Sequence, residues 1–483
     1  MTVPTVRNFI GGNWSASSGG ETLAIHDPAT GETLGIVPLS PATDVDAAVQ
    51  AAHAAFPGWR ATPAVERARV LFRLRALLQD HAGEIARSLT REHGKNLAET
   101  RGELQRGIEN VEHASGVATL MMGESLEDVA PGIDCVTYRQ PLGVFAAITP
   151  YNFPVMIPLW FWPYAVATGN TFVLKPSEQD PLTHQIIVEL AAQAGLPPGV
   201  LNVVHGARDT VEALLDNPGI AGISFVGSSR VARIVYARAA ASGKRVQALG
   251  GAKNHMIVLP DADLDAAGEA LIGSLFGSAG QRCLAGSVIV GVGDAYDGVR
   301  ERFLDRASAL RIGYGLHDGV EMGPLISGAH KERVVGYIDR GESEGASLAL
   351  DGRGITVEGF PQGHWVGPTV FEDVSPSMAL GSDEIFGPVA GLTRARDVEE
   401  AVGLMQQVGY GNAASIFTAS GKAAREFRYR AGISMLGVNV GVAAPMAFFP
   451  FGGSRGSFYG DLKAQGSDAI AFYTDRRVVI ERW

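Results

Sequence analysis

The sequence has little cysteine: Cys135 and Cys283 are the only two among its 483 residues. Two cysteines cannot build a disulfide framework or a cysteine-rich zinc site, which indicates a reducing compartment. The eleven histidines show no HExxH motif or similar spacing of metal ligands. We therefore expect no bound metal.

Positive charge is also scarce. Lys and Arg number 40 against 51 Asp and Glu, which gives a net charge of −11. An acidic chain lacks the electrostatic footprint of a protein that binds nucleic acid or anionic lipid. The N-terminus has no apolar segment of the kind found in secretory signals. We expect a cytoplasmic protein without a nucleic-acid partner.

No hydrophobic run is long enough and uninterrupted enough to cross a membrane. The longest uncharged stretch, residues 140–174, contains five prolines, which would repeatedly break a spanning helix. This stretch therefore predicts a buried core and no membrane partner.

Glycine is abundant, with 61 residues, and helical and strand patterns alternate along the chain. Apolar spacing predicts helices over 45–56, 64–87, 96–120 and 152–168. Short apolar runs predict strands over 144–149, 170–174, 200–204 and 222–226, and the tail 469–480 is strand-like. This order is typical of an α/β fold whose parallel sheet has helices on both faces, followed by a second α/β domain.

Cys283 follows the glycine-rich turn Gly277-Ser-Ala-Gly-Gln-Arg and precedes a buried strand. The adjacent Arg282 favours the thiolate, which is the reactive form of cysteine. Taken alone, this context fits a buried structural thiol slightly better than a nucleophile. Cys135 lies in a strand-like hairpin with no nearby base and reads as structural.

Other candidates lie at the ends of predicted strands, where doubly wound sheets bind ligands. The Asn152 amide can donate to an oxyanion together with the Cys283 backbone N–H, although a helix cap is the simpler interpretation. Lys175 and Glu178 can bind ribose hydroxyls or simply form a turn before a helix. Ser228 begins a helix that can approach a pyrophosphate, although without a GxGxxG motif an ordinary capped helix is the simpler interpretation. Glu384 lies in a turn that can face a cofactor.

Seven segments together resemble the aldehyde dehydrogenase superfamily in the family's own order, over nearly the whole chain. They are Phe9-Ile-Gly-Gly-Asn-Trp14, Pro150-Tyr-Asn-Phe-Pro154, Gly169-Asn-Thr-Phe-Val-Leu-Lys-Pro-Ser-Glu178, Phe225-Val-Gly-Ser228, Gly280-Gln-Arg-Cys283, Glu384-Ile-Phe-Gly-Pro388 and Phe449-Pro-Phe-Gly-Gly453.

The resemblance implies a Rossmann-like NAD-binding domain (1–122 and 141–249), a catalytic domain (250–440) and a small β oligomerisation arm (123–140 and 462–483) of a homodimer or homotetramer. It implies that Cys283 is the nucleophile and that Asn152 completes the oxyanion hole. The cofactor-binding positions it implies are Thr149, Tyr151, Lys175, Glu178, Gln179, Ser228, Gly250 and Glu384.

One departure from the family pattern concerns deacylation. Hydrolytic members carry a Glu that activates water in an Glu-Leu-Gly-Gly-Lys motif, and that position falls on Leu249 here. No carboxylate occurs between Lys244 and Leu259, so a water-activating base is missing from that segment.

The subgroup that lacks this Glu comprises the CoA-acylating methylmalonate- and malonate-semialdehyde dehydrogenases, which this chain resembles in several further stretches. One of them is Gly251-Ala-Lys-Asn-His255, and another is Ala444-Pro-Met-Ala-Phe-Phe-Pro450. In that subgroup two arginines bind the substrate carboxylate, and Arg106 and Arg282 occupy the matching positions. Gln281, Gly453 and Arg455 depart from the subgroup pattern.

The resemblance therefore implies NAD-dependent oxidation of a carboxylated semialdehyde through a thioester on Cys283, with coenzyme A as acyl acceptor. Glu178 beside a ribose would repel a 2′-phosphate, which favours NAD over NADP. The alternatives are a hydrolytic NAD(P)-dependent dehydrogenase of another aldehyde, which yields a free acid, and a non-catalytic protein on the same fold.

Overall fold

The fully buried apolar run Val144–Ile148 forms strand β7 within an eight-stranded sheet of the computed structural model, which describes residues 3–483. β7 pairs in parallel with β8 (Thr171–Lys175) and β10 (Ile220–Val226). Outward from these three strands, the sheet continues on one side with β11 (Arg245–Leu249) and β19 (Phe458–Gly460), and on the other with β9 (Leu201–Val203), β1 (Asn8–Ile10) and β2 (Asn13–Ser15). The predicted α/β fold class is confirmed.

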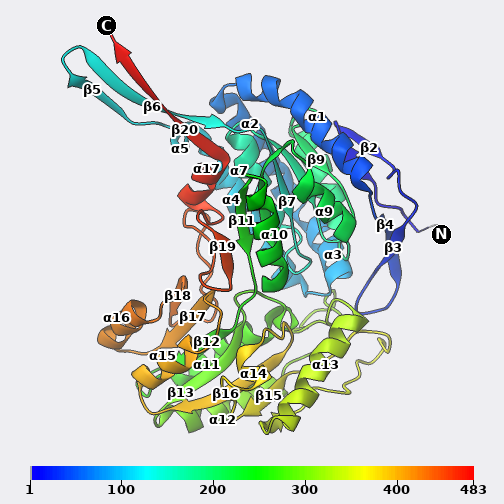
Figure 1. Ribbon diagram of the computed structural model, residues 1–483. Helices are drawn as coiled ribbons and strands as arrows, with labels where there is room; N and C mark the ends of the chain where they lie inside the picture. Colours follow the sequence, from blue (N-terminus) through cyan, green and yellow to red (C-terminus); the bar gives the residue numbers. More distant parts are fainter. Residues whose placement is uncertain (1–2) are drawn as a thin grey trace.

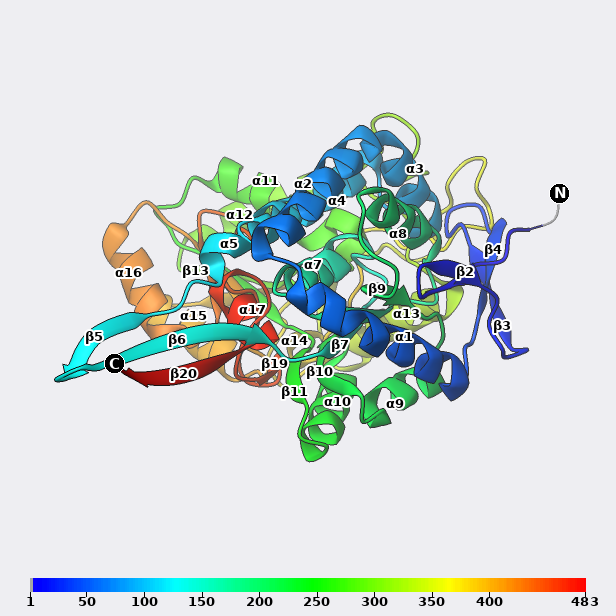
Figure 2. The same ribbon diagram turned by 90° about the horizontal axis from the view of Figure 1, so that it is seen from above.

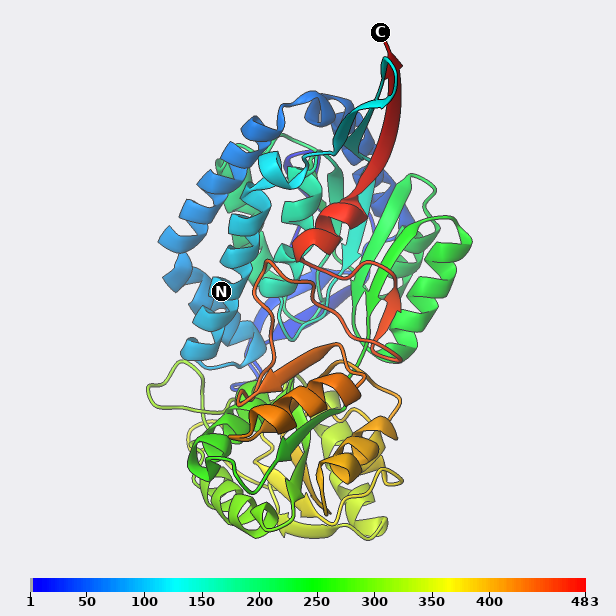
Figure 3. The ribbon, with the colours of Figure 1, turned by 90° about the vertical axis from the view of Figure 1, so that its left-hand side faces the viewer.

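Two layers of helices cover this sheet, because alternate residues of β7 point to opposite faces. Val144, Ala146 and Ile148 belong to one core, shared with α1 (Ala42–Ala61), α9 (Arg208–Asp216) and α10 (Ser229–Ala241). Phe145 and Ala147 belong to a second core. Most of the helices that share it are α2 (Ala64–Asp80), α3 (Ala82–His93), α4 (Leu97–Ser115), α5 (Val117–Leu120), α6 (Met156–Leu159), α7 (Trp162–Ala167) and α8 (Leu182–Gln193). Figure 3 shows the lighter blue helices, which follow α1 in the chain, on one side of the sheet and the green helices on the other.

The second lobe contains a seven-stranded sheet that is parallel except at one edge. In spatial order its strands are β14 (Ser347–Leu350), β15 (Thr369–Glu372), β16 (Val389–Ala395), β13 (Gly286–Val292), β12 (Asn254–Val258), β17 (Ala413–Phe417) and β18 (Met435–Val438). Its helices are α11 (Leu264–Phe276), α12 (Ala295–Ser308), α13 (Gly328–Ser343), α14 (Ala379–Ser382), α15 (Val398–Gln406) and α16 (Gly421–Arg430). A short 3₁₀ turn, η1 (Gly277–Gly280), follows α11.

A three-stranded arm projects from the first lobe (Figures 1 and 2). It consists of β5 (Ser125–Ala130), β6 (Ile133–Pro141) and the C-terminal β20 (Thr474–Arg482), with β6 in the middle. A hairpin of β3 (Thr22–His26) and β4 (Thr33–Pro38) completes the fold. The residue limits of the three predicted domains remain predictions. Strand β19 follows the second lobe in the sequence but belongs to the sheet of the first lobe.

Four predicted elements differ from the structure, and one of them, the predicted helix 96–120, is divided at Gly116 into α4 and α5. The predicted helix 64–87 is two helices, α2 and α3, because the backbone at His81 leaves the helical conformation. The predicted helix 152–168 is reduced to α6 and α7, and residues 152–155 form an irregular bend. The strand-like tail begins as helix α17 (Gly466–Tyr473), because Phe472 and Tyr473 pack against Phe145 in the core before β20 starts.

None of the helices within residues 3–483 has the length and apolar character needed to cross a membrane. In the same residues, no cluster of three or more His, Cys, Asp or Glu side chains is arranged to hold a metal ion.

Candidate active site

The loop that carries Cys283 joins α11 to β13 and has an unusual backbone. Ser278, Ala279 and Gly280 have φ values of 51°, 52° and 71°, so three consecutive residues lie in the left-handed region. A Cβ at Gly280 would lie 2.3 Å from the carbonyl oxygen of Gly387, so only glycine fits there. Non-glycine residues in this conformation are strained, and such strain persists only where surrounding contacts enforce it.

Two asparagines fix the backbone at Cys283. Asn254 Nδ2 and Asn412 Nδ2 donate hydrogen bonds of 2.9 and 2.8 Å to the carbonyl oxygen of Cys283. Asn254 begins β12 and Asn412 immediately precedes β17, so the second lobe's sheet holds the cysteine in place.

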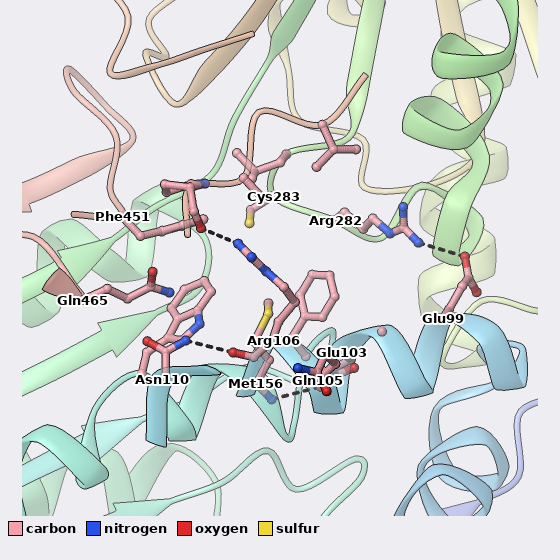
Figure 4. Close-up of a pocket in the computed structure, with 17 residues that line it drawn as sticks. Glu99, Glu103, Gln105, Arg106, Asn110, Met156, Arg282, Cys283, Phe451 and Gln465 are labelled. Atoms are coloured by element: carbon pink, nitrogen blue, oxygen red, sulfur yellow. Dashed lines mark hydrogen bonds and ion pairs between the residues drawn. The ribbon is translucent and has the colours of Figure 1, made fainter. Parts of the chain in front are cut away.

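Cys283 lies between two cavities and is the one described residue that lines both. The first cavity has a volume of about 410 Å³ and lies between α4 and the 442–451 segment. The second has a volume of about 300 Å³ and lies at the strand ends of the first sheet. In Figure 4 the sulfur of Cys283 faces the first cavity.

The electrostatics at Cys283 differ from the sequence expectation. Burial, reinforced by the negative charge of Glu384, raises the pKa of the Cys283 thiol to about 12. The backbone N–H groups of Cys283 and Leu284 and the Arg282 guanidinium lower this pKa, but they are outweighed. Arg282 does favour the thiolate, as predicted, but desolvation of the charge is the larger effect, so the thiol pKa of the ligand-free protein is raised.

Asn152 lies in the bend between β7 and α6, close to the cysteine loop. Its side chain is buried, and Nδ2 donates a 3.1 Å hydrogen bond to the carbonyl oxygen of Gln281, two residues before Cys283. The alternative interpretation as a helix cap is wrong, since Val155 is the residue that caps α6. The Asn152 amide is thus a donor beside the Cys283 loop.

The two candidate carboxylate-binding arginines both line the first cavity, and both already contact protein groups. Arg106 extends from α4 (Figure 4), lies 2.8 Å from Glu109 and donates to the carbonyl oxygen of Pro445. Arg282 forms a 2.9 Å ion pair with Glu99. The cationic wall of this cavity is therefore partly neutralised by acidic neighbours.

The second cavity is built largely from backbone at strand ends. Gly227, Ser228, Gly250 and Gly251 line it, and Ser228 is the N-cap residue of α10. A Cβ at Gly251 would lie 2.2 Å from Glu384 Oε2, and one at Gly250 would lie 2.7 Å from Ser229 Oγ. Glycine at both positions therefore lets Glu384 and Ser229 pack closely against this backbone, beside a helix N-terminus of the kind at which phosphate groups bind well.

Glu384 is held against this glycine segment. Its Oε1 accepts a 2.9 Å hydrogen bond from the backbone N–H of Ala252, and burial raises its pKa to about 7. From α13, Arg333 donates to the carbonyl oxygens of Glu384 and Ile385 at 2.7 and 2.6 Å. His330 Nε2 lies 2.7 Å from the carbonyl oxygen of Phe386, whose φ of 63° is left-handed.

The remaining cofactor candidates lie outside both cavities. Lys175 Nζ is 2.8 Å from Glu178 Oε2, and Lys175 pairs with Ile148 across the neighbouring strand ends of β8 and β7. Thr149 and Gln179 lie on the same segments, and neither side chain lines the second cavity. Tyr151, Asn152, Ser228, Gly250 and Glu384 do line it.

The position at which hydrolytic members of the resembled family carry a base is occupied by Leu249, buried in the core at the end of β11. Glu384 is the one carboxylate among the described residues that line the second cavity.

Sequence analysis missed several residues of the site: Lys95, Glu99, Glu103, Asn254, His330, Arg333 and Asn412. Most of them act through backbone contacts, and no spacing rule reveals such contacts. One signal could have pointed to Glu99: Asn96 and Glu99 have the spacing of a capping box, and the structure contains that box at the start of α4.

The fold and site define a two-lobed α/β protein with a buried thiol between a side-chain-lined cavity and a glycine-lined cavity. Residues 14–479 match the aldehyde dehydrogenase family. The chain is 52% identical to malonate-semialdehyde dehydrogenase 3 of Geobacillus kaustophilus (strain HTA426), with 99% of each chain covered.

Two solved structures have a TM-score of 0.98 and 45% identity to this chain, each over 100% of it. One is methylmalonate-semialdehyde dehydrogenase from Oceanimonas doudoroffii, of which 99% is covered. The other is a protein of Sinorhizobium meliloti 1021 complexed with NAD, of which 98% is covered. The chain belongs to the aldehyde dehydrogenase family and is an oxidoreductase, as the sequence motifs predicted.

Proposed function

We propose that this enzyme oxidises malonate semialdehyde or methylmalonate semialdehyde with NAD, and that it transfers the acyl group from Cys283 to coenzyme A. The observation that carries the proposal is the position of Cys283 between two cavities, with Leu249 where hydrolytic relatives have a base. The names of its relatives support the substrate, and the NAD complex of a structural neighbour supports the cofactor.

The residues of the second cavity fit NAD. The N-terminus of α10 at Ser228 and the glycines at 227, 250 and 251 suit a pyrophosphate, and the carboxylate of Glu384 suits ribose hydroxyls. Lys175 and Glu178 would bind the second ribose, with Thr149, Tyr151 and Gln179 nearby. When bound there, NAD supplies the acceptor for the aldehyde hydride.

The chain's own groups supply the rest of the chemistry. After the Cys283 thiol has lost its proton to solvent, the thiolate adds to the aldehyde carbon, and the Asn152 amide and Cys283 backbone N–H stabilise the resulting oxyanion. Loss of one such donor typically lowers the rate ~10²–10³-fold. Loss of hydride leaves a thioester on Cys283, and the thiolate of CoA displaces that sulfur.

The first cavity would hold the substrate's carboxylate. Arg106 and Arg282 on its wall can form charge-assisted pairs with it before the carboxyl group leaves as CO₂ or bicarbonate. The products would be acetyl-CoA from malonate semialdehyde and propionyl-CoA from methylmalonate semialdehyde.

The test is NADH formation with both semialdehydes, with and without CoA, combined with identification of the product. We expect turnover to depend on CoA and to yield the acyl-CoA. Equal turnover without CoA, with a free acid as product, would contradict the acylating assignment.

One observation favours a second candidate, hydrolysis. Glu384 lines the same cavity as Cys283, and its pKa of about 7 suits a general base. The hydrogen bond from Ala252 to Glu384 and the proposed contact with ribose argue against this role. Hydrolysis would appear in the same assay as turnover that is independent of CoA.

The arm would pair subunits in a homodimer or homotetramer. Leu126, Val478 and Ile480 on β5 and β20 are exposed large apolar side chains, which is unusual for a free surface. Sedimentation velocity of the full chain tests this assembly.

The cytoplasmic location remains a prediction.

A further inference from the structure

Lys95 and Glu103 form a buried ion pair beneath the bend that carries Asn152. Their side chains are 1% and 0% exposed, and Lys95 Nζ lies 2.5 Å from Glu103 Oε2. Lys95 lies just before α4 and Glu103 lies within it. Glu103 also lines the first cavity, whereas Lys95 lines neither cavity.

The pair contacts the bend at both of its ends. Lys95 Nζ donates a 2.5 Å hydrogen bond to the carbonyl oxygen of Asn152 and lies 4.1 Å from the centre of the Phe153 ring. Glu103 Oε1 accepts hydrogen bonds from the backbone N–H groups of Val155 (2.9 Å) and Met156 (3.1 Å). These bonds provide partners for backbone groups that an irregular buried segment would otherwise leave unpaired.

Stability alone does not account for such a pair. Burial lowers the pKa of the Lys95 ammonium, and the Glu103 carboxylate opposes that shift, so each charge needs the other. Replacing a buried ion pair with apolar residues of similar volume is often neutral for stability. The value of the pair lies in fixing the conformation of the bend.

The same stretch of chain also holds the cysteine loop. Glu99 Oε1 accepts hydrogen bonds from the backbone N–H of Ser278 (2.6 Å) and from Arg282 (2.9 Å). Residues 95–103 therefore contact the segment with the oxyanion donor and the segment with the nucleophile. Asn152 Nδ2 and the Gln281 carbonyl join these two segments directly.

We propose that Lys95 is a positioning residue of the oxyanion site: by holding the Asn152 carbonyl, it fixes the position of the Asn152 amide relative to Cys283. The inference rests on the proposed roles of Cys283 and Asn152. A donor displaced by about 1 Å can lower a rate ~10²-fold.

The experiment compares Lys95→Met, Asn152→Ala and the double variant by single-turnover NADH formation. We expect Lys95→Met to slow acylation about 10–100-fold. In the Asn152→Ala background the same change should slow it less than about threefold, because the donor that Lys95 positions is already gone. Alkylation of Cys283 forms no oxyanion, so its rate should change less than about twofold.

A matched control is Arg75→Met, which removes the exposed ion pair between Arg75 of α2 and Glu112 of α4. It should leave the acylation rate unchanged. If Lys95→Met does not fold, the double variant Lys95→Met/Glu103→Leu replaces it in the experiment, since the double variant leaves no unpaired buried charge.

Two results would overturn the inference: an unchanged acylation rate in the Lys95 variant, or an equal loss in the presence and absence of the Asn152 amide. The second would mean a merely structural role. If Asn152→Ala itself leaves acylation unchanged, the proposed function fails instead.

Discussion

The two cavities that share Cys283 are built in different ways. Long side chains from α4, including Arg106, form much of the first cavity, whereas glycines and strand ends form much of the second. Backbone groups suit features that all dinucleotides share, whereas charged side chains select a particular substrate. We therefore expect substrate choice to depend on the first cavity and cofactor binding on the second.

The thiol between the cavities provides the prediction with the largest effect. With a pKa of about 12 against an ordinary 9.0, Cys283 has ~10³-fold less thiolate at pH 8 than an ordinary thiol. In cofactor-free Cys135→Ser protein, we expect iodoacetamide to alkylate Cys283 far more slowly than free cysteine. The rate should rise about tenfold per pH unit between pH 8 and 10. A rate that reaches a plateau below pH 8 would show that the thiol is activated without ligand.

The first cavity is tested by Arg106→Leu. Loss of a charge-assisted pair should raise KM for a semialdehyde acid about 10–100-fold, and change it little for a neutral aldehyde of similar size. KM for NAD should stay constant, because Arg106 does not line the second cavity. The control is Arg101→Leu, on the exposed face of α4. Equal losses with acidic and neutral aldehydes would argue against binding of a carboxylate.

The second cavity is tested by Glu384→Gln, with a smaller expected effect. The change should raise KM for NAD about fivefold at pH 8, where the wild-type side chain is charged. Because burial raises the pKa of Glu384 to about 7, the wild-type KM for NAD should rise as pH falls through 7. The variant should lack this rise. The control is Asp383→Asn, because Asp383 is next in sequence and does not line the cavity. An identical pH profile in both variants would contradict the assignment of Glu384 to NAD binding.

The order of seven motifs along the chain, and its resemblance to a known family, indicated the chemistry-bearing residues, whereas the local context of each residue alone favoured a structural role. Cys283, Asn152 and Glu384 do line one cavity. The ionisation state of Cys283 could not be predicted in the same way. Arg282 is next in sequence, but burial sets the thiol pKa, and burial is a property of the packed molecule.

Helix boundaries show the same difference between what the sequence predicts and what only the packed structure determines. Apolar spacing located α1, α2 and α4, yet residues 152–155 form a bend where spacing predicts a helix. Hydrogen bonds from the bend to Lys95 and Glu103 replace the helical ones there. Both partners come from a segment about fifty residues earlier in the chain.

The sequence by itself determined the α/β class, the family and the absence of a base at Leu249, since each depends on residue type and order along the chain. The tertiary structure decided which groups face one another: the two cavities on either side of one sulfur, the raised thiol pKa, and the buried Lys95–Glu103 pair under Asn152. These features depend on desolvation and on contacts between distant segments, and both arise only when the chain is packed.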